Sequence, residues 1–371
     1  MIAIIAVAIF VMGAIKPKSK KIFGFICVFM WLLMAFTYGN ADEPVYIARY
    51  TQSGVWTGQT ELLYGLIINV CNRLGFSFLQ FKAVVTAAQM LLVASTVWKY
   101  SKQPNLVMLL YFLCPFTLNV AQMRHALASA VFIFGVRYLI EDYEDKPKRF
   151  KITNNDVKYV ICILLATMIH TASLIWLVLL FAKKFSIVFN ILFTAIINIL
   201  IIFVITPSNL AMIASKFGAA DRIAAYLSEE YQTTAWRHYG QIVWVLFVAF
   251  IVFSICIHII NNKKLYKNFN QISLAFKANI AILCICGILL RYTGEVYRMQ
   301  EGMFVLNYIL ITNSLKKDDY SNYNFYYRDV KVISLALVYV IGVMWMMILQ
   351  HNLETIWLPV FQNNYFFDLF L

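Results

Sequence analysis

Arginine and histidine residues within or beside long apolar runs are the residues of this sequence best suited to chemistry. Arg124 lies in the apolar run 119–139, His170 lies in the run 158–180, and Arg298 lies late in the chain. Charge in a bilayer is costly, so such residues usually have a partner or a function. Arginine stays ionised when partly buried and binds phosphate through paired hydrogen bonds, and histidine can act as a general base. These residue types indicate a site for a lipid-linked phosphate or diphosphate.

A carboxylate and two tyrosines near the start of the chain form a second candidate group. Asp42, Tyr46 and Tyr50 recur at every fourth position in DEPVYIARY. Asp42 competes with His170 for the role of general base. Simpler interpretations remain open, because the segment also fits a solvated loop. His170 also fits a neutral histidine bonded to Ser173 or to a free carbonyl at a kink.

A third group of charged residues lies close to Arg298. Arg291, Glu295 and Arg298 are spaced i, i+4 and i+7, which predicts that a continuous helix would carry them on one face. Glu301 follows one turn after Arg298. Plain ion pairs, Arg291 with Glu295 and Arg298 with Glu301, are an equal alternative. Arg124 can likewise reach the outer headgroups by snorkelling.

Several kinds of chemistry leave no signature in the sequence. It contains no hydrolase-like nucleophile motif, no glycine-rich nucleotide loop and no paired metal-binding carboxylates. The 7 cysteines lie in or beside apolar runs without metal-like spacing, so we interpret them as small hydrophobic residues. We therefore expect neither a metal site nor a cofactor.

The composition determines the fold class that must position these residues. The 371 residues are 62% hydrophobic and 13% charged, with a mean hydropathy of +0.73. Apolar blocks of this length predict an all-α, polytopic integral membrane protein, with residues 1–371 forming a single transmembrane domain. The net charge of +13 is concentrated between the apolar runs. That distribution indicates cytoplasmic loops and gives no evidence for nucleic acid as a partner.

Placing every basic cluster on the cytoplasmic side threads the chain through the membrane as about ten transmembrane helices. Within this path the run 158–180 fits best as a broken, re-entrant hairpin that turns near His170. A single span would put Lys183, Lys184 and all later basic clusters on the wrong side. A single span compensated by an error elsewhere is the alternative.

The same threading defines two outer regions. Residues 39–75 form an outer loop, in which 61–75 are too short and too polar to span and are predicted to lie on the surface as an amphipathic helix. Residues 207–237 form a second outer loop with a further predicted surface helix. All the candidate residues then collect in the outer half of the membrane.

The order of these motifs resembles the Wzy-type polysaccharide polymerases, in particular their EpsG-like branch. The matching segments are DEPVYIARY, MRHALASA with Arg124, IHTAS with His170 and Ser173, and EVYRMQEGMF with Arg298. The resemblance covers about residues 39–310. His125 stands where Gln is usual, which leaves the role of that position open.

The resemblance implies a membrane glycosyltransferase similar to the GT-C class, acting at the outer face of the bacterial cytoplasmic (inner) membrane. Such enzymes need no nucleotide sugar and no obligatory metal. The implied donor and acceptor are both oligosaccharide repeat units carried on undecaprenyl diphosphate, within the membrane lipid. The growing chain moves from its carrier onto the non-reducing end of the next lipid-linked unit. Such systems can also depend on a separate chain-length regulator protein.

Roles for the candidate residues follow from this implied reaction. We assign Arg124 and Arg298 to the diphosphate, with Arg291 as a weaker helper, because fixed cations stabilise charge that develops on a leaving group. His170 is the first candidate for the base that activates the acceptor hydroxyl, or for orienting the diphosphate. Asp42 is the competing base. The candidates for sugar binding are Tyr46, Tyr50, Glu295 and Glu301.

Two other functions would use similar residues. A flippase or exporter of the lipid-linked unit also needs cations, but it should show internal repeats and charges along a whole transport path. A membrane O-acyltransferase would use a buried histidine reached from the cytoplasm, and His170 at a hairpin tip keeps that option open. A structural subunit would not need arginines at these depths.

Overall fold

The chain is helical throughout the part that the computed structural model describes, which confirms the predicted all-α class. The described residues are 2–52, 61–141, 143, 151–206, 208, 209, 212, 235–262, 269–292, 294–314, 325–349 and 353–369. Among them the one extended pairing is an isolated bridge between Thr37 and Asn364.

Apolar helices of membrane-spanning length make this a multi-pass membrane protein. Among the described residues, 5 helices are long and apolar enough to cross a bilayer. They are Phe78–Tyr100, Pro104–Ala121, Met123–Glu141, Tyr239–Asn261 and Asn270–Arg291. Shorter apolar helices accompany them at Ile2–Ile15, Ile187–Phe203 and Val330–Trp345. Large apolar side chains on these helices are exposed, for example Leu91 and Phe250, as expected of surfaces that face lipid.

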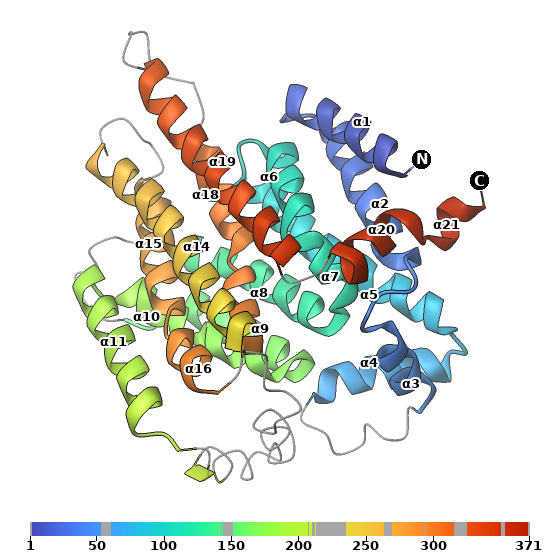
Figure 1. Cartoon of the computed structure of the whole chain (residues 1–371), viewed down its shortest axis with the longest axis horizontal. Helices are drawn as coiled ribbons and strands as arrows, with labels where there is room; N and C mark the ends of the chain where they lie inside the picture. The colour runs from blue at the N-terminus through green and yellow to red at the C-terminus, as the bar shows by residue number, and fades with distance from the viewer. Residues whose placement is uncertain are drawn as a thin grey trace. The chain divides into compact units, whose positions relative to one another are not determined.

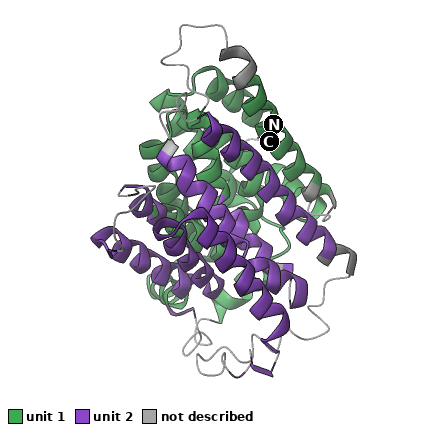
Figure 2. Cartoon of the chain, turned by 90° about the vertical axis from the view of Figure 1, so that its left-hand side faces the viewer, with its two compact units in different colours: residues 1–57, 63–134, 304–371 green, residues 58–62, 135–303 purple. Residues whose placement is uncertain are grey.

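The chain divides into two compact units, drawn in green and purple in Figure 2. Unit 1 comprises residues 1–57, 63–134 and 304–371, and unit 2 comprises residues 58–62 and 135–303. Helix α8 (Met123–Glu141) passes from the first unit into the second.

Unit 1 combines helices from both ends of the chain, labelled in Figure 1. Besides the first part of α8, its elements are α1 (Ile2–Ile15), α2 (Lys20–Phe36), α3 (Glu43–Thr51), α4 (Leu62–Arg73), α5 (Phe78–Tyr100), α6 (Pro104–Tyr111), η2 (Phe112–Phe116), α7 (Thr117–Ala121), α18 (Phe304–Ser314), α19 (Phe325–Leu349), η7 (Leu353–Trp357), α20 (Leu358–Gln362) and α21 (Tyr365–Asp368).

Helices α2 and α5 pack closely against each other within unit 1. Helix α5 begins with a capping box, in which Ser77 and Gln80 each accept the other's backbone N–H through their side chains. The Trp31 indole N–H of α2 donates to the Ala83 carbonyl of α5 at 3.0 Å. This bond satisfies a polar donor on an otherwise apolar helix surface.

The span Pro104–Ala121 is interrupted at its middle. Cys114 and Pro115 leave helical geometry, with φ −163° and −102° respectively. The Tyr308 hydroxyl of α18 donates to the Cys114 carbonyl at 2.8 Å. A broken helix is tolerated at membrane depth where protein groups bond the exposed backbone, and Tyr308 supplies such a bond.

Unit 2 holds the remaining elements, which run through the middle of the chain. After the end of α8 they are α9 (Asn154–Ile169), η3 (Thr171–Val178), α10 (Leu179–Lys184), α11 (Ile187–Phe203), α14 (Ala235–Asn261), α15 (Phe269–Ile282), α16 (Ile285–Arg291), η6 (Gly294–Tyr297) and α17 (Arg298–Glu301).

The predicted hairpin is present in unit 2. Helix α9 ends at Ile169, His170 has an extended backbone with φ −148° and ψ 112°, and the chain continues as the 3-10 helix η3. The returning arm packs against α9, where the Tyr159 hydroxyl donates to the Trp176 carbonyl at 2.7 Å. Lys183 Nζ then lies 2.7 Å from Asp156 Oδ1, so both arms end at the same level.

The two segments predicted to lie outside the membrane differ in how far the structure describes them. Residues 61–75 contain the helix α4, with Leu62, Leu66 and Val70 exposed along one side. The polar segment before it contains a further helix, α3. The second predicted outer loop, 207–237, lies almost entirely outside the described residues.

Candidate functional site

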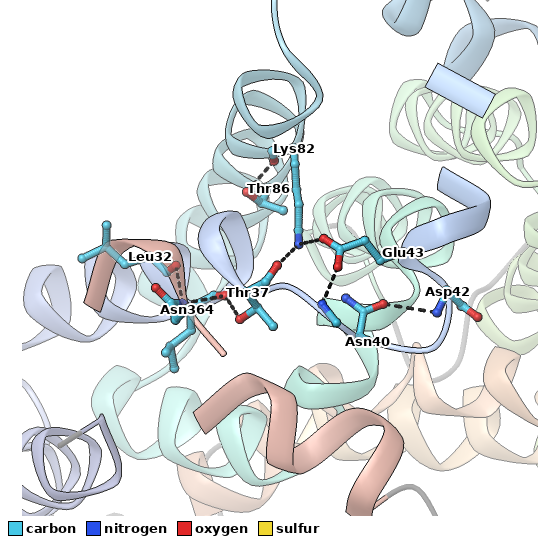
Figure 3. Close-up of polar contacts among 10 residues, drawn as sticks. Leu32, Thr37, Asn40, Asp42, Glu43, Lys82, Thr86 and Asn364 are labelled. Atoms are coloured by element: carbon cyan, nitrogen blue, oxygen red, sulfur yellow. Dashed lines mark hydrogen bonds and ion pairs between the residues drawn. The ribbon is translucent and has the colours of Figure 1, made fainter. Parts of the chain in front are cut away.

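A buried lysine holds the loop that leads into α3. Lys82 on α5 is 3% exposed, and its ammonium donates to the Thr37 carbonyl and lies 3.3 Å from Glu43 Oε1 (Figure 3). The second carboxylate oxygen of Glu43 accepts the Gly39 N–H at 2.5 Å. Gly39 has φ +76°, a conformation that favours glycine. A buried cation requires such partners, and here they fix the start of α3.

The C-terminal segment secures the same loop from another side. Asn364 is fully buried, and its side-chain amide donates to the Leu32 carbonyl at 3.3 Å. The Tyr38 N–H donates to the Asn363 carbonyl at 3.1 Å, and the rings of Tyr38 and Tyr365 stack with centroids 4.3 Å apart. Segments more than three hundred residues apart in sequence therefore meet at the entrance to α3 (Figure 3).

Within unit 1 the structure brings together two of the predicted site residues. The Arg124 guanidinium lies over the Tyr46 ring, 5.8 Å from its centroid. The Arg124 backbone N–H also points to the Tyr46 hydroxyl at 3.4 Å. Cation–π contact keeps a guanidinium in place without neutralising its charge. The start of α8 therefore presents an oriented cation beside an aromatic ring.

The other predicted residues of α3 have different surroundings. Tyr50 is 4% exposed, its hydroxyl donates to the Phe76 carbonyl at 2.7 Å, and its ring packs on Phe81. These contacts hold α3 against the start of α5. Asp42 is half-buried at the N-cap position of α3, makes no side-chain capping bond there, and its backbone N–H donates to Asn40.

His125, next to Arg124, is a buried residue in the first turn of α8. It is 4% exposed, and its Nε2 lies 3.3 Å from the Ser129 hydroxyl one turn later. At this position the sequence departs from the family pattern. The histidine here takes part in packing within the helix.

In unit 2, His170 occupies the tip of the hairpin as predicted. Its Nδ1 lies 3.3 Å from Oε1 of Glu61, whose side chain is 1% exposed. The same Glu61 oxygen accepts the Thr171 N–H at 3.4 Å. Ser173 is fully buried, and its backbone N–H donates to the His170 carbonyl at 3.0 Å, which closes the turn.

The hairpin is attached to the segment that carries Arg298. The Trp176 indole N–H donates to the Met299 carbonyl at 3.0 Å. A Cβ at Gly302 would come within 2.5 Å of Trp176, so only glycine fits under the ring. Arg298, half-buried at the start of α17, is therefore fixed to the arm that follows His170.

The expected single helical face for Arg291, Glu295 and Arg298 is wrong. Helix α16 ends at Arg291, because Tyr292 leaves helical geometry with φ −123° and ψ −63°. Glu295 then lies in η6, and Arg298 begins the separate helix α17. Arg291 is exposed and rests on the ring of Tyr292, 5.8 Å from the centroid. Glu301, at the end of α17, is 4% exposed.

The base of the hairpin carries a network of charges outside the apolar spans. Asp156 pairs with Lys183 at 2.7 Å and with Lys184 at 2.5 Å, and it accepts the Thr153 N–H at 2.8 Å. Burial alone would raise the pKa of Asp156, but these hydrogen bonds and charges lower it to about 2. Asp156 is therefore an ionised, structural carboxylate.

Lys82 and Glu61 are buried ionisable residues that were not identified as site candidates from the sequence. Lys82 is a cation within an apolar span, a signal of the same kind as that of Arg124. Glu61 precedes the surface helix with no such signal, since its partner is 109 positions away. No group of three or more His, Cys, Asp or Glu side chains suited to a metal occurs in the part of the chain that the structure describes.

In the comparison with family models, the model of the EpsG family matches residues 20–361, a range that extends beyond the motifs on both sides. No curated protein and no solved structure matches the chain.

Proposed function

The chain belongs to the EpsG family, which is linked to exopolysaccharide biosynthesis, and on this premise we propose that it is a polysaccharide polymerase. The proposed enzyme joins oligosaccharide repeat units carried on undecaprenyl diphosphate at the outer face of the bacterial cytoplasmic membrane. The observation that carries the proposal is the Arg124 guanidinium held over the Tyr46 ring, in a membrane protein of this family.

The proposed reaction transfers the growing glycan between two lipid carriers. The acceptor hydroxyl attacks the anomeric carbon of the donor, and the bond between that carbon and the diphosphate breaks. Negative charge develops on the departing diphosphate, and fixed cations lower the energy of that transition state. Arg124 and Arg298 are the proposed cations, with the exposed Arg291 in a helper role.

Proton transfer completes the proposed reaction. His170 takes the proton of the acceptor hydroxyl, and Asp42 is the competing base. The break between α9 and η3 supports His170, because it presents the imidazole at the tip of a hairpin, 18% exposed. Tyr46 is the better candidate for stacking on a sugar, since the Tyr50 ring is held by Phe81. Glu295 and Glu301 remain candidates for bonding sugar hydroxyls.

Glycan length in a deletion strain tests this function. We expect lipid-linked glycans to stop at one repeat unit and the wild-type gene to restore a ladder. Arg124→Ala should leave the single unit, because loss of one transition-state cation costs about 10²- to 10³-fold in rate. Arg73→Ala is the matched control, since Arg73 is exposed at the end of α4. It should restore the full ladder.

Other outcomes would replace the proposal. Absence of even the single repeat unit at the outer face would indicate a flippase or exporter. An intact ladder that lacks an acyl group would indicate an O-acyltransferase. A normal ladder from Arg124→Ala and from Arg298→Ala would remove the diphosphate assignment.

A further inference from the structure

Glu61 and His170 form an ion-pair geometry at the hairpin tip that the assigned roles above do not use. Glu61 directly precedes α4, while His170 lies between α9 and η3, and both belong to unit 2. The Glu61 carboxylate is 1% exposed, and the imidazole is 18% exposed. A carboxylate buried to this degree needs hydrogen-bond donors, and His170 and Thr171 supply them to one oxygen.

The contact involves a particular nitrogen of the imidazole. Nδ1 lies 3.3 Å from Glu61 Oε1. Because an ionised carboxylate can only accept a hydrogen bond, this contact favours the tautomer that carries its hydrogen on Nδ1. A histidine that donates through one nitrogen carries its lone pair on the other, which is here Nε2. The Thr171 N–H bond to the same oxygen holds the carboxylate against the start of η3. The tautomer and the orientation of the ring are thereby both set from outside the hairpin.

We propose that Glu61 is a positioning residue that makes His170 a general base for the acceptor hydroxyl. This inference rests on the function proposed above. The acceptor O–H proton moves to His170 Nε2 as the acceptor oxygen forms its bond to the anomeric carbon. The electron pair of the broken bond leaves with the diphosphate, which is later released with a proton from the imidazolium. Glu61 stays ionised and stabilises the imidazolium between these steps.

The charge of Glu61 and its bonding geometry can be separated by substitution. Glu61→Gln keeps the side-chain length and an oxygen that accepts from His170 and Thr171, but it removes the charge. We expect kcat to fall about 10- to 100-fold, part of the rate gain that a general base supplies. The KM for the lipid-linked substrate should stay within about twofold, because Glu61 acts through His170 and not on the substrate. Glu354→Gln, at an exposed carboxylate, is the matched control and should match the wild type.

The pH profile distinguishes this role from simple capping of η3. An adjacent carboxylate raises the pKa of a histidine, so its loss should move the acidic limb of kcat/KM to lower pH. Elements packed on η3 carry further charged groups of unit 2, which are Asp156 and Lys158 on α9, Lys183 and Lys184 on α10, Lys277 on α15, and Arg298 and Glu301 on α17. These groups are the same in both proteins, so a shift of the limb reports the Glu61 charge.

The experiment uses full-length protein in lipid nanodiscs and lipid-linked repeat units extracted from the deletion strain. A double-mutant cycle adds His170→Gln and Glu61→Gln/His170→Gln. We expect the double variant to be no slower than His170→Gln alone, because Glu61 acts through the imidazole. Additive losses, or a normal rate and pH profile in Glu61→Gln, would overturn the role of Glu61.

A measurement on the wild type keeps the proposal testable if Glu61→Gln does not accumulate. Nitrogen NMR of ¹⁵N-histidine-labelled protein, assigned by loss of the His170→Gln signal, reports the tautomer directly. The Nδ1–H form is expected, and the Nε2–H form would contradict the proposal. If wild-type protein forms no polymer from these units, the proposed function fails. If it does polymerise and His170→Gln is inactive, a normal Glu61→Gln defeats this inference alone.

Discussion

At each end of the hairpin α9–η3–α10 a carboxylate contacts one or two basic side chains, but the two contacts differ in length and exposure. At the base, Asp156 contacts two lysines at 2.7 and 2.5 Å, and the three side chains are 4% to 12% exposed. At the tip, Glu61 meets one histidine at 3.3 Å, and that histidine is 18% exposed. The base is therefore a network of two short contacts, whereas the tip has a single longer contact and a more exposed partner.

The difference lies in the chemistry of the basic partner. At the base of the hairpin, Lys183 and Lys184 contact the two oxygens of the Asp156 carboxylate, so the network ties the two arms together. At the tip the partner is an imidazole, the side-chain type that serves most often as a general acid or base. A hairpin clamped at its base that presents an imidazole at its tip is an arrangement suited to acid–base chemistry.

The largest expected effect comes from removing the ion pairs at the base of the hairpin. Asp156→Asn leaves Lys183 and Lys184 buried without their counter-charge, and removal of one partner from a buried ion pair costs about 3 to 5 kcal/mol. We expect a loss of this size in the free energy of unfolding, measured by SDS titration in mixed micelles. Glu354→Gln, an exposed acid-to-amide change, is the control and should cost less than about 0.5 kcal/mol. A similarly small loss in Asp156→Asn would mean that the clamp does not stabilise the hairpin.

Low pH alone should weaken the ion pairs at the base of the hairpin in the wild-type protein. The folded-state pKa of Asp156 is about 2 against an ordinary value of 3.8, so its contribution of about 2 kcal/mol is complete above the ordinary pKa. That contribution is lost as the pH falls toward 2. We expect the difference in unfolding free energy between wild type and Asp156→Asn to shrink by about 1 kcal/mol from pH 7 to pH 3. A difference independent of pH would show that Asp156 is not the group involved.

The hairpin itself could be predicted from sequence because charge placement is a strong constraint on membrane topology. Lys183 and Lys184 had to lie on the side from which α9 starts, and a break near His170 was the simplest solution. Helix α4 could be predicted for a similar reason, since a short amphipathic segment between apolar runs cannot span. The hairpin follows from the distribution of basic clusters along the chain, whereas α4 follows from one short stretch of sequence.

The contacts that define the candidate site could not be predicted in this way. Glu61 meets His170 across 109 positions, and Lys82 meets Glu43 across 39, so no local periodicity records either pair. The i, i+4, i+7 argument for Arg291 and Arg298 failed because it assumed one continuous helix. Gly294 between them was the available warning, since glycine weakens a helix interior.

The smallest effect on stability is expected at the tip. Glu61→Gln removes a buried charge, yet it leaves no ammonium group without its counter-charge, because the partner of Glu61 is an imidazole and not a lysine. The new amide oxygen can still accept from His170 and Thr171, so both hydrogen bonds persist. We expect a loss below about 1 kcal/mol in the same SDS titration. A loss close to that of Asp156→Asn would make the tip a second clamp, and a reduced polymerisation rate in Glu61→Gln could then be explained by unfolding of the hairpin.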